Sequence, residues 1–466
     1  AEAEPETAPA PRLSLRRRIA QGLNGSANRL NRLWDRLFPE ETTQAPDEPA
    51  AEPLSADDKA PEPRNVLLAN LVVLVALIIP LVVGVVVIGL ALSDTDNTDF
   101  EACRLDVIEL RDAAQNTNPP PGASLDDDNA TQARARWAIV REEALLCENE
   151  RPGDEEMRRI AGEAQNNLDR FDRITRREVT PLRRFEENAQ LRGPVAGNWI
   201  TLYTLDRTTD AVYQDVLSED GTTLVEVRQE PILFQGQNIA FEVVDELVDI
   251  EWMVRGGLPT GGTNVPVALD ESGLLVWYSE TFNEASAFRL VTPSTWSRPV
   301  GVALWRLNLY VLDAGAEQIW RYVPNDGLYS DAPQEYFTGD NRPSLANAVD
   351  LGIDEEGAIY ILFADGSLQK YLGGAAAPFD LFNLPAGALV AGNSLYVDNS
   401  PLARQLLVTD PANETLYTIS WGGTVNTGYR PLNQFNAFEN LSGGIANPEG
   451  GHFYAVANNT LYYFSR

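Results

Sequence analysis

The amino-acid sequence predicts a mainly β protein, in which a six-bladed β-propeller is preceded by a single transmembrane helix and a helical stalk. Three observations support this prediction: an uncharged segment at 66–92, a charged region of helical periodicity after it, and a strand–turn–strand phrase that recurs after residue 190. The predicted parts are a juxtamembrane linker (1–64), a transmembrane helix (65–92), an extracytoplasmic helical stalk (94–185) and a propeller (190–466).

The linker is rich in Ala, Pro, Glu and Asp at both ends, a composition typical of disordered segments. Between these ends, residues 15–37 place leucines at helical spacing opposite arginines, which predicts a basic amphipathic helix. Such a helix could lie on the anionic cytoplasmic leaflet or dock onto a further domain, and both readings stay open. Because the chain begins with an acidic tract at Ala1 and no signal sequence, we expect more protein upstream.

The segment 66–92 contains no charged side chain. At ~1.5 Å rise per residue a helix of this length would extend ~40 Å, more than the ~30 Å hydrocarbon core of a bilayer. A signal peptide is a poor match, because its apolar region would end within ~15 residues near the N-terminus. Lys59 and Arg64 precede the segment closely, whereas acidic residues follow it until Arg104. The positive-inside rule therefore predicts a single-pass protein of the cell membrane, with a cytoplasmic N-terminus and membrane lipid as a partner.

Three segments of the stalk, 99–115, 131–149 and 154–179, show apolar residues at helical spacing. The run Asn118-Pro-Pro-Pro-Gly122 separates the first two, which predicts an αα-hairpin. Antiparallel pairing would bring Cys103 and Cys147 together beside the membrane. In an oxidising location one disulfide is expected, and two buried free thiols are the alternative.

The propeller is predicted from a recurring phrase of the form Leu-Tyr-x-Leu-Asp, followed each time by a turn and a second strand. Its central residues are Tyr203, Leu275, Tyr310, Tyr360, Leu407 and Tyr454. The last three intervals are 50, 47 and 47 residues, and a period of ~40–50 residues is typical of propeller blades. The earlier intervals of 72 and 35 residues suggest an insertion such as Gly256–Val265.

The phrase from Trp296 to Tyr322 (WSRPVGVALWRLNLYVLDAGAEQIWRY) resembles NHL-type repeats. The order of parts resembles the C-terminal part of bacterial membrane-anchored PP2C-type (PPM) Ser/Thr protein phosphatases, and certain bacterial receptor kinases share the plan. The resemblance implies a cytoplasmic phosphatase or kinase domain before the span. No metal-binding Asp motif of the phosphatase and no Gly-rich or catalytic loop of a kinase occurs in this chain, so no catalytic residue is carried over.

The sequence offers few candidates for chemistry, and no cofactor is expected. His452 is the single histidine, no Gly-x-Ser-x-Gly elbow is present, and we interpret His452 as a turn residue. Propeller lactonases hold Ca²⁺ in the central channel with oxygen ligands. The starts of predicted strands offer the weak metal candidates Asp249 and Asp350, with Glu251 and Asn447 beside them. Acidic capping of blade ends explains these residues equally well, so no metal is assigned.

The net charge of −32 excludes nucleic acid as a partner, because an acidic exterior repels phosphate. The sequence therefore predicts a chain that is not an enzyme: an extracytoplasmic sensor or binding propeller for an unknown ligand or protein, coupled to a cytoplasmic signalling domain. The alternatives are an envelope scaffold and a membrane-tethered propeller hydrolase. An acidic exterior is also typical of an ordinary solvated surface.

Overall fold

The computed structural model describes residues 98–120, 128–197, 200–254, 258–260, 263–339, 342–432, 436–447 and 451–466. The predicted linker (1–64) and transmembrane helix (65–92) lie outside the described residues. Among the residues in these ranges, no helix combines the length and the apolar character needed to cross a membrane.

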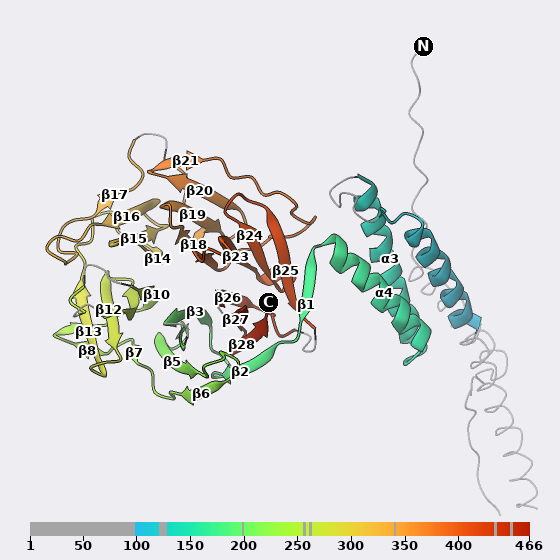
Figure 1. Ribbon diagram of the computed structural model, residues 1–466, viewed down its shortest axis with the longest axis horizontal. Helices are drawn as coiled ribbons and strands as arrows, with labels where there is room; N and C mark the ends of the chain where they lie inside the picture. Colours follow the sequence, from blue (N-terminus) through green and yellow to red (C-terminus); the bar gives the residue numbers. More distant parts are fainter. Residues whose placement is uncertain are drawn as a thin grey trace, which may run out of the picture. The chain divides into compact units, whose positions relative to one another are not determined.

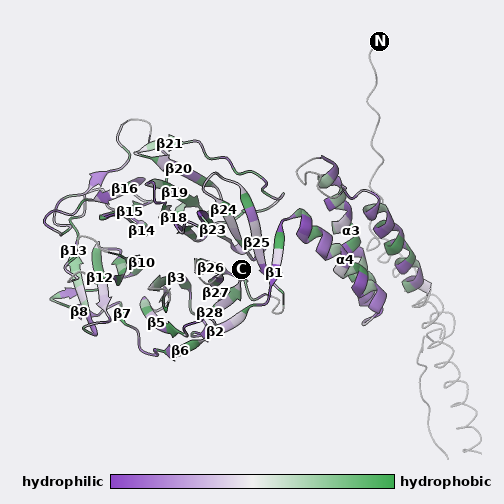
Figure 2. Ribbon diagram, viewed as in Figure 1, coloured by the Kyte–Doolittle hydropathy of each residue, from purple (hydrophilic) through white to green (hydrophobic). Residues whose placement is uncertain are grey.

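Three helices form a small bundle with its own core: a helix over 98–115, α3 (Asp128–Glu150) and α4 (Glu155–Phe171). Buried positions in α3 recur at alternating intervals of three and four residues, the spacing that keeps one helix face against its neighbours. These positions are Ala130, Ala133, Trp137, Val140, Ala144 and Cys147. Figure 2 shows the corresponding mixture of hydrophilic and hydrophobic residues along α3 and α4.

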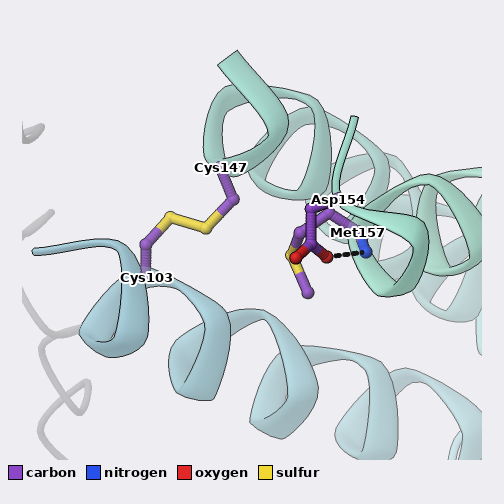
Figure 3. The surroundings of a disulfide bond; sticks show 4 residues. All are labelled: Cys103, Cys147, Asp154 and Met157. Carbon is purple, nitrogen blue, oxygen red and sulfur yellow. Dashed lines mark hydrogen bonds between the residues drawn. A yellow bond between two sulfur atoms is a disulfide. The ribbon is translucent and has the colours of Figure 1, made fainter. Parts of the chain in front are cut away.

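A disulfide joins Cys103, near the start of the first helix, to Cys147, near the end of α3 (Figure 3). The two Cα atoms are 5.9 Å apart, and the cysteines are 44 residues apart in the chain. Close by, the Asp154 carboxylate caps α4 by accepting hydrogen bonds from the backbone N–H groups of Glu156 and Met157, at 3.1 and 3.0 Å. The bundle is thus closed at this end by a covalent bond and a helix cap.

The third helix ends earlier than the sequence predicts. It was expected to reach residue 179, but α4 ends at Phe171 and the backbone at Arg173 is left-handed (φ 53°). The next residues, Ile174 and Thr175, are β-branched and form the start of a strand, β1 (Ile174–Arg177). The predicted boundary between stalk and propeller is therefore too late, since β-structure begins at residue 174.

The propeller contains six sheets arranged around a central axis (Figure 1). The first two blades are β3 (Leu191–Gly197), β4 (Thr201–Asp206), β5 (Ala211–Leu217) and β6 (Leu224–Val227), then β10 (Leu247–Met253), β11 (Val265–Asp270), β12 (Leu274–Ser279) and β13 (Glu284–Arg289). The third and fourth are β14 (Pro299–Trp305), β15 (Asn308–Asp313), β16 (Gln318–Tyr322) and β17 (Gln334–Glu335), then β18 (Ala348–Ile353), β19 (Ala358–Phe363), β20 (Leu368–Leu372) and β21 (Ala375–Ala377).

The fifth and sixth blades are completed by the chain segment that precedes the first blade. The fifth has β22 (Leu395–Asp398), β23 (Gln405–Asp410), β24 (Thr415–Ser420) and β25 (Val425–Pro431), with β1 added in parallel to β25. The sixth has β26 (Leu441–Asn447), β27 (His452–Ala457) and β28 (Thr460–Ser465), and β2 (Thr180–Arg184) pairs with β28 as its outermost strand. The pairing of β1 and β2 with the last two blades therefore joins the N-terminal and C-terminal ends of the ring.

The first strands of the blades line the axis, because β3, β10, β14, β18, β22 and β26 contact one another in that order and β26 contacts β3. The second strands β4, β11, β19 and β23 are buried along their whole length. Neighbouring blades cover both faces of such a strand, so its sequence reads as a continuous apolar run without alternation. This packing is the physical origin of the recurring apolar phrase.

The second blade was identified through the wrong strand. Leu275 lies in β12, the third strand, and the second strand is β11, whose sequence VPVALD lacks the tyrosine found in β4, β15, β19 and β27. The longer interval arises in part before this blade, where β7 (Leu233–Phe234), β8 (Asn238–Ile239) and β9 (Glu242–Val243) are inserted. The expected insertion at Gly256–Val265 falls in the loop before β11, part of which lies outside the described residues.

Four second strands end in a buried aspartate that holds the turn after it: Asp206, Asp270, Asp313 and Asp410. Asp313 is fully buried. Its Oδ1 accepts hydrogen bonds from the backbone N–H groups of Arg298, Gly315 and Ala316, at 2.9, 3.1 and 2.9 Å. Its Oδ2 accepts from Ser297 N and Trp320 Nε1, at 3.0 and 3.2 Å. The aspartate therefore joins the turn to the segment that enters the same blade.

We expect Asp313→Ala to lower the free energy of unfolding by about 3–4 kcal/mol, because it leaves several buried donors without an acceptor. Urea denaturation of the full chain, followed by tryptophan fluorescence, measures the change. The exposed Asp331 of the same blade supplies a control, since Asp331→Ala should change stability by less than about 0.5 kcal/mol. Equal effects of the two substitutions would contradict the proposed role of Asp313.

Candidate functional site

The channel along the propeller axis opens into a cavity of about 520 Å³ at the end where the first strands finish. We call this the main cavity. Its polar lining residues are Arg192, Asp249, Glu251, Asn264, Asp350, Ser394, Tyr396, Asp398, Asn399 and Ser400. Apolar and aromatic side chains from the same strands complete the wall, among them Pro194, Trp252, Leu395 and Ile445. Every blade contributes at least one lining residue, so the cavity exists only in the closed ring.

The opposite end of the channel is rich in amide side chains. A cavity of about 480 Å³ there is lined by Asn188, Gln190, Asn393, Asn440, Asn458 and Asn459, together with charged and small residues. Arg192 lines this cavity as well as the main cavity. Its side chain therefore lies between the two ends of the channel.

Arg192 is held by two carboxylates from other blades. Its Nε donates to Asp249 Oδ1 at 2.6 Å, and its Nη2 donates to Asp350 Oδ1 at 3.1 Å and to the Val300 carbonyl at 3.2 Å. All three charged side chains are more than nine-tenths buried. We refer to Arg192, Asp249 and Asp350 as the central ion cluster.

The two carboxylates also bind backbone N–H groups of neighbouring strands. Asp249 Oδ2 accepts from Val302 N at 2.9 Å, and Asp350 Oδ2 accepts from Leu395 N at 2.8 Å. Strands β3, β10, β14, β18 and β22 are thus linked through one cluster. Gly301 leaves room for it, because a Cβ there would lie 3.4 Å from Asp350 Oδ1 and 2.9 Å from the Leu351 side chain.

Burial dominates the electrostatics of the cluster. It raises the pKa of Asp350 to about 7, although the positive charge of Arg192 acts in the opposite direction. Burial alone would lower the pKa of Arg192, but the Coulombic attraction of Asp249 and Asp350 outweighs it and raises that pKa. The Arg192 guanidinium therefore stays positively charged, and it forms an ion pair with each of the two carboxylates.

Glu251, like Asp398, is an acidic side chain of the main cavity that has no cationic partner among the described residues. Burial raises its pKa to about 8, the backbone N–H of Trp252 opposes the shift, and the charges of Asp249 and Asp350 add to it. Among the described residues, its carboxylate accepts one hydrogen bond, at Oε1 from Trp252 N at 2.9 Å. Near neutral pH the Glu251 side chain is thus mainly protonated and faces an open volume.

The structure brings the predicted metal candidates Asp249 and Asp350 together, with Glu251 nearby, but their shared cation is the Arg192 guanidinium. Asn447 ends β26 and does not line the main cavity. In the described part of the chain, no group of three or more His, Cys, Asp or Glu side chains is arranged to hold a metal ion.

His452 is the first residue of β27, not a turn residue, and its Nδ1 lies 3.2 Å from the Tyr463 hydroxyl. Sequence reasoning missed Arg192, Trp252 and Tyr396. The sequence offered one signal, an arginine directly after the apolar Leu191. The structure buries this arginine, and a buried arginine requires an anionic partner. That signal does not say which acids the partners are.

No family model matches the chain, and no curated protein matches it. Among solved structures, it is similar to a streptogramin B lyase (12% identity, 62% of this chain and 97% of that chain, TM-score 0.39). It is also similar to a gluconolactonase from Xanthomonas campestris (13% identity, 63% and 91%, TM-score 0.40) and to a virginiamycin B lyase from Staphylococcus aureus (9% identity, 62% and 88%, TM-score 0.37). At these identities the similarity concerns the fold.

The prediction that this chain is not an enzyme is corrected, because the solved structures to which it is similar include enzymes, a streptogramin B lyase and a gluconolactonase. At these identities and TM-scores they assign no activity to this chain. The prediction relied on the lack of a contiguous motif. In a propeller, however, the residues around the channel come from different blades, one or two at a time, and form no motif in the sequence. Enzyme activity is neither assigned nor excluded by the fold. The sheet topology shows a six-bladed β-propeller, and the comparisons assign no family.

Proposed function

We propose that this chain is the anchoring and recognition part of a bacterial signalling protein. In this proposal residues 65–92 cross the cell membrane, and the helical bundle and propeller stand outside the cytoplasm. The propeller binds a ligand or protein in or at its channel. A cytoplasmic domain, of the PP2C-type phosphatase class that the order of parts resembles, would receive the signal.

The observation that carries the proposal is the order of parts along the chain. An uncharged segment of 27 residues at 66–92 precedes a helical bundle and then a propeller with a cavity in its channel. Such a segment has the length of a membrane span. The positive-inside rule favours a cytoplasmic N-terminus.

The disulfide of the bundle supports the same orientation. Structural disulfides persist in oxidising compartments and are rare in the cytosol. Cys103 and Cys147 are bonded to each other, and they are the two cysteines of the chain. An extracytoplasmic bundle accounts for this bond without a further assumption.

The experiment expresses the full chain with a C-terminal tag in a bacterial host. We expect the tag in the membrane fraction after alkaline carbonate extraction, and we expect added protease to remove it from intact spheroplasts. A maleimide reagent should label the cysteines only after reduction. The variant Leu77→Arg/Val82→Arg, which places two charges in the span, should release the chain from the membrane. Recovery of the unaltered chain in the soluble fraction, or protection of the tag until lysis, would overturn the proposal.

A further inference from the structure

We infer that the main cavity binds an organic cation, a primary ammonium or guanidinium group on an aliphatic stem, with Glu251 as its counter-ion. The inference rests on the proposed recognition function of the propeller and names its ligand class. It does not require membrane anchoring, so the two can be tested separately.

The first argument is the size and lining of the cavity. Its volume of about 520 Å³ lies within the range of small-molecule sites, which is roughly 300–1,000 Å³. Apolar residues such as Pro194, Leu395 and Ile445 share the wall with carboxyl, hydroxyl and amide groups. A ligand with an apolar stem and one polar end group fits this combination.

The second argument is the negative charge of the cavity wall that is not paired with a cationic side chain of the protein. Asp249 and Asp350 are engaged with Arg192, and Asp398 accepts from Ser400 N at 3.0 Å and Gln405 Nε2 at 3.2 Å. Glu251 Oε2 accepts no hydrogen bond from any described residue. Glu251 Oε2 is therefore the carboxylate oxygen of this wall that is open to a ligand, and Asp398, held by neutral donors, adds to the negative charge of the wall. At pH 8 Glu251 is partly ionised, because its pKa is about 8, and a bound cation favours the charged form. A cation is thus the complement of this wall.

The third argument comes from the aromatic side chains around Glu251. The Trp252 indole is stacked on the Tyr203 ring, with centroids 5.8 Å apart and planes at 16°, which holds it in place. Gly197 permits this position, since a Cβ there would lie 2.9 Å from the indole. The Tyr396 side chain lines the same cavity. Burial, the charge of Asp398 and the charge of Glu251 all raise the pKa of its hydroxyl. Aromatic rings beside a carboxylate favour ammonium and guanidinium groups.

Other ligand classes fit less well. An anion would face Glu251, and the positive charge of Arg192 is already offset by the carboxylates of Asp249 and Asp350. A calcium ion takes roughly six to eight oxygen ligands. The carboxylates nearest to Glu251 are bound to the Arg192 guanidinium.

The experiment is isothermal titration calorimetry on the full chain in detergent micelles at pH 8 and 150 mM salt. The probes are N-acetyl-lysine methylamide, which represents a peptide side chain, and agmatine, which represents a free amine. N-acetyl-norleucine methylamide is the neutral isostere of the first probe. We expect a cationic probe to bind at least about tenfold more tightly than the norleucine compound, and the tighter of the two cations identifies the source.

The substitution Glu251→Gln keeps the shape of the side chain and removes its charge, and it should weaken binding of the cation at least about tenfold. Tyr396→Phe, which removes only a hydroxyl, should weaken it a few-fold. Glu271→Gln is the matched control, because Glu271 is an exposed acid near the other end of the channel. It should leave the dissociation constant within about twofold. Near-UV circular dichroism checks that each variant is folded.

Several outcomes would overturn the inference: neither cation binds at millimolar concentration, the norleucine compound binds equally well, calcium binds in place of the cations, or Glu251→Gln and Glu271→Gln have equal effects. If Glu251→Gln does not fold, Tyr396→Phe replaces it as the test: an unchanged affinity of that variant for the cation would also overturn the inference. Failure of binding in a chain that passes the spheroplast experiment would remove this inference and leave the proposed function in place.

Discussion

Arg192→Met is expected to lower the free energy of unfolding of the propeller by about 3–5 kcal/mol, the cost of leaving buried carboxylates without their cation. Asp249 and Asp350 would both remain in the interior without their shared cation. Because the cluster links five first strands, we expect its loss to affect the whole ring. Denaturation of the full chain by guanidinium chloride, followed by tryptophan fluorescence, measures the change.

A rescue variant distinguishes loss of charge balance from loss of packing. Arg192→Met/Asp249→Asn/Asp350→Asn replaces the cluster by neutral groups and keeps acceptors for the Val302 and Leu395 N–H groups. We expect it to recover most of the lost stability, since neutral replacements of buried ion clusters are often tolerated. Arg207→Met is the control, because Arg207 is exposed and 4.0 Å from Glu246. If Arg192→Met behaves like Arg207→Met, the cluster does not stabilise the ring.

Glu251→Gln is expected to stabilise the propeller at pH 8 by about 2–4 kcal/mol and to have little effect at pH 4. Burial raises the pKa of Glu251 to about 8 from its ordinary value of 4.5. At a pH between these two values, Glu251 has lost its proton in the unfolded chain but still holds it in the native chain. The stability of the native chain should therefore fall as pH rises from about 4.5 to about 8 through this group.

Urea denaturation of both chains at half-unit pH intervals measures this effect as the difference between two stability curves. Asp350, whose pKa is raised to about 7, contributes in the same direction but is present in both chains, so it largely cancels in the difference. Two curves that run parallel from pH 4 to pH 8 would contradict the assignment. A buried acid that reduces stability near neutral pH is typical of a functional site, which agrees with the ligand role inferred for Glu251.

The elements of this fold were accessible to pattern reasoning where local periodicity is strong. Trp137 and Cys147 occupy regular helical positions, and Tyr310 and Tyr360 lie in second strands that are buried on both faces. The pattern failed at β11, because the neighbouring β12 (LLVWYS) has the longer apolar run and the aromatic residues, and at β2, whose sequence TPLRR has no apolar run. β2 is a strand because it pairs with β28, far along the chain.

The amino-acid order was sufficient for the blade repeat, the three helices and the six-bladed count, because each depends on contacts between residues close in the chain. The central ion cluster depended on ring closure, which brings Arg192 to partners 57 and 158 residues away. Glu251 became a candidate ligand-binding acid for the same reason: its desolvation and its lack of a cationic partner among the described residues are properties of the assembled channel. Long-range proximity, unlike periodicity, leaves no local trace in a single sequence.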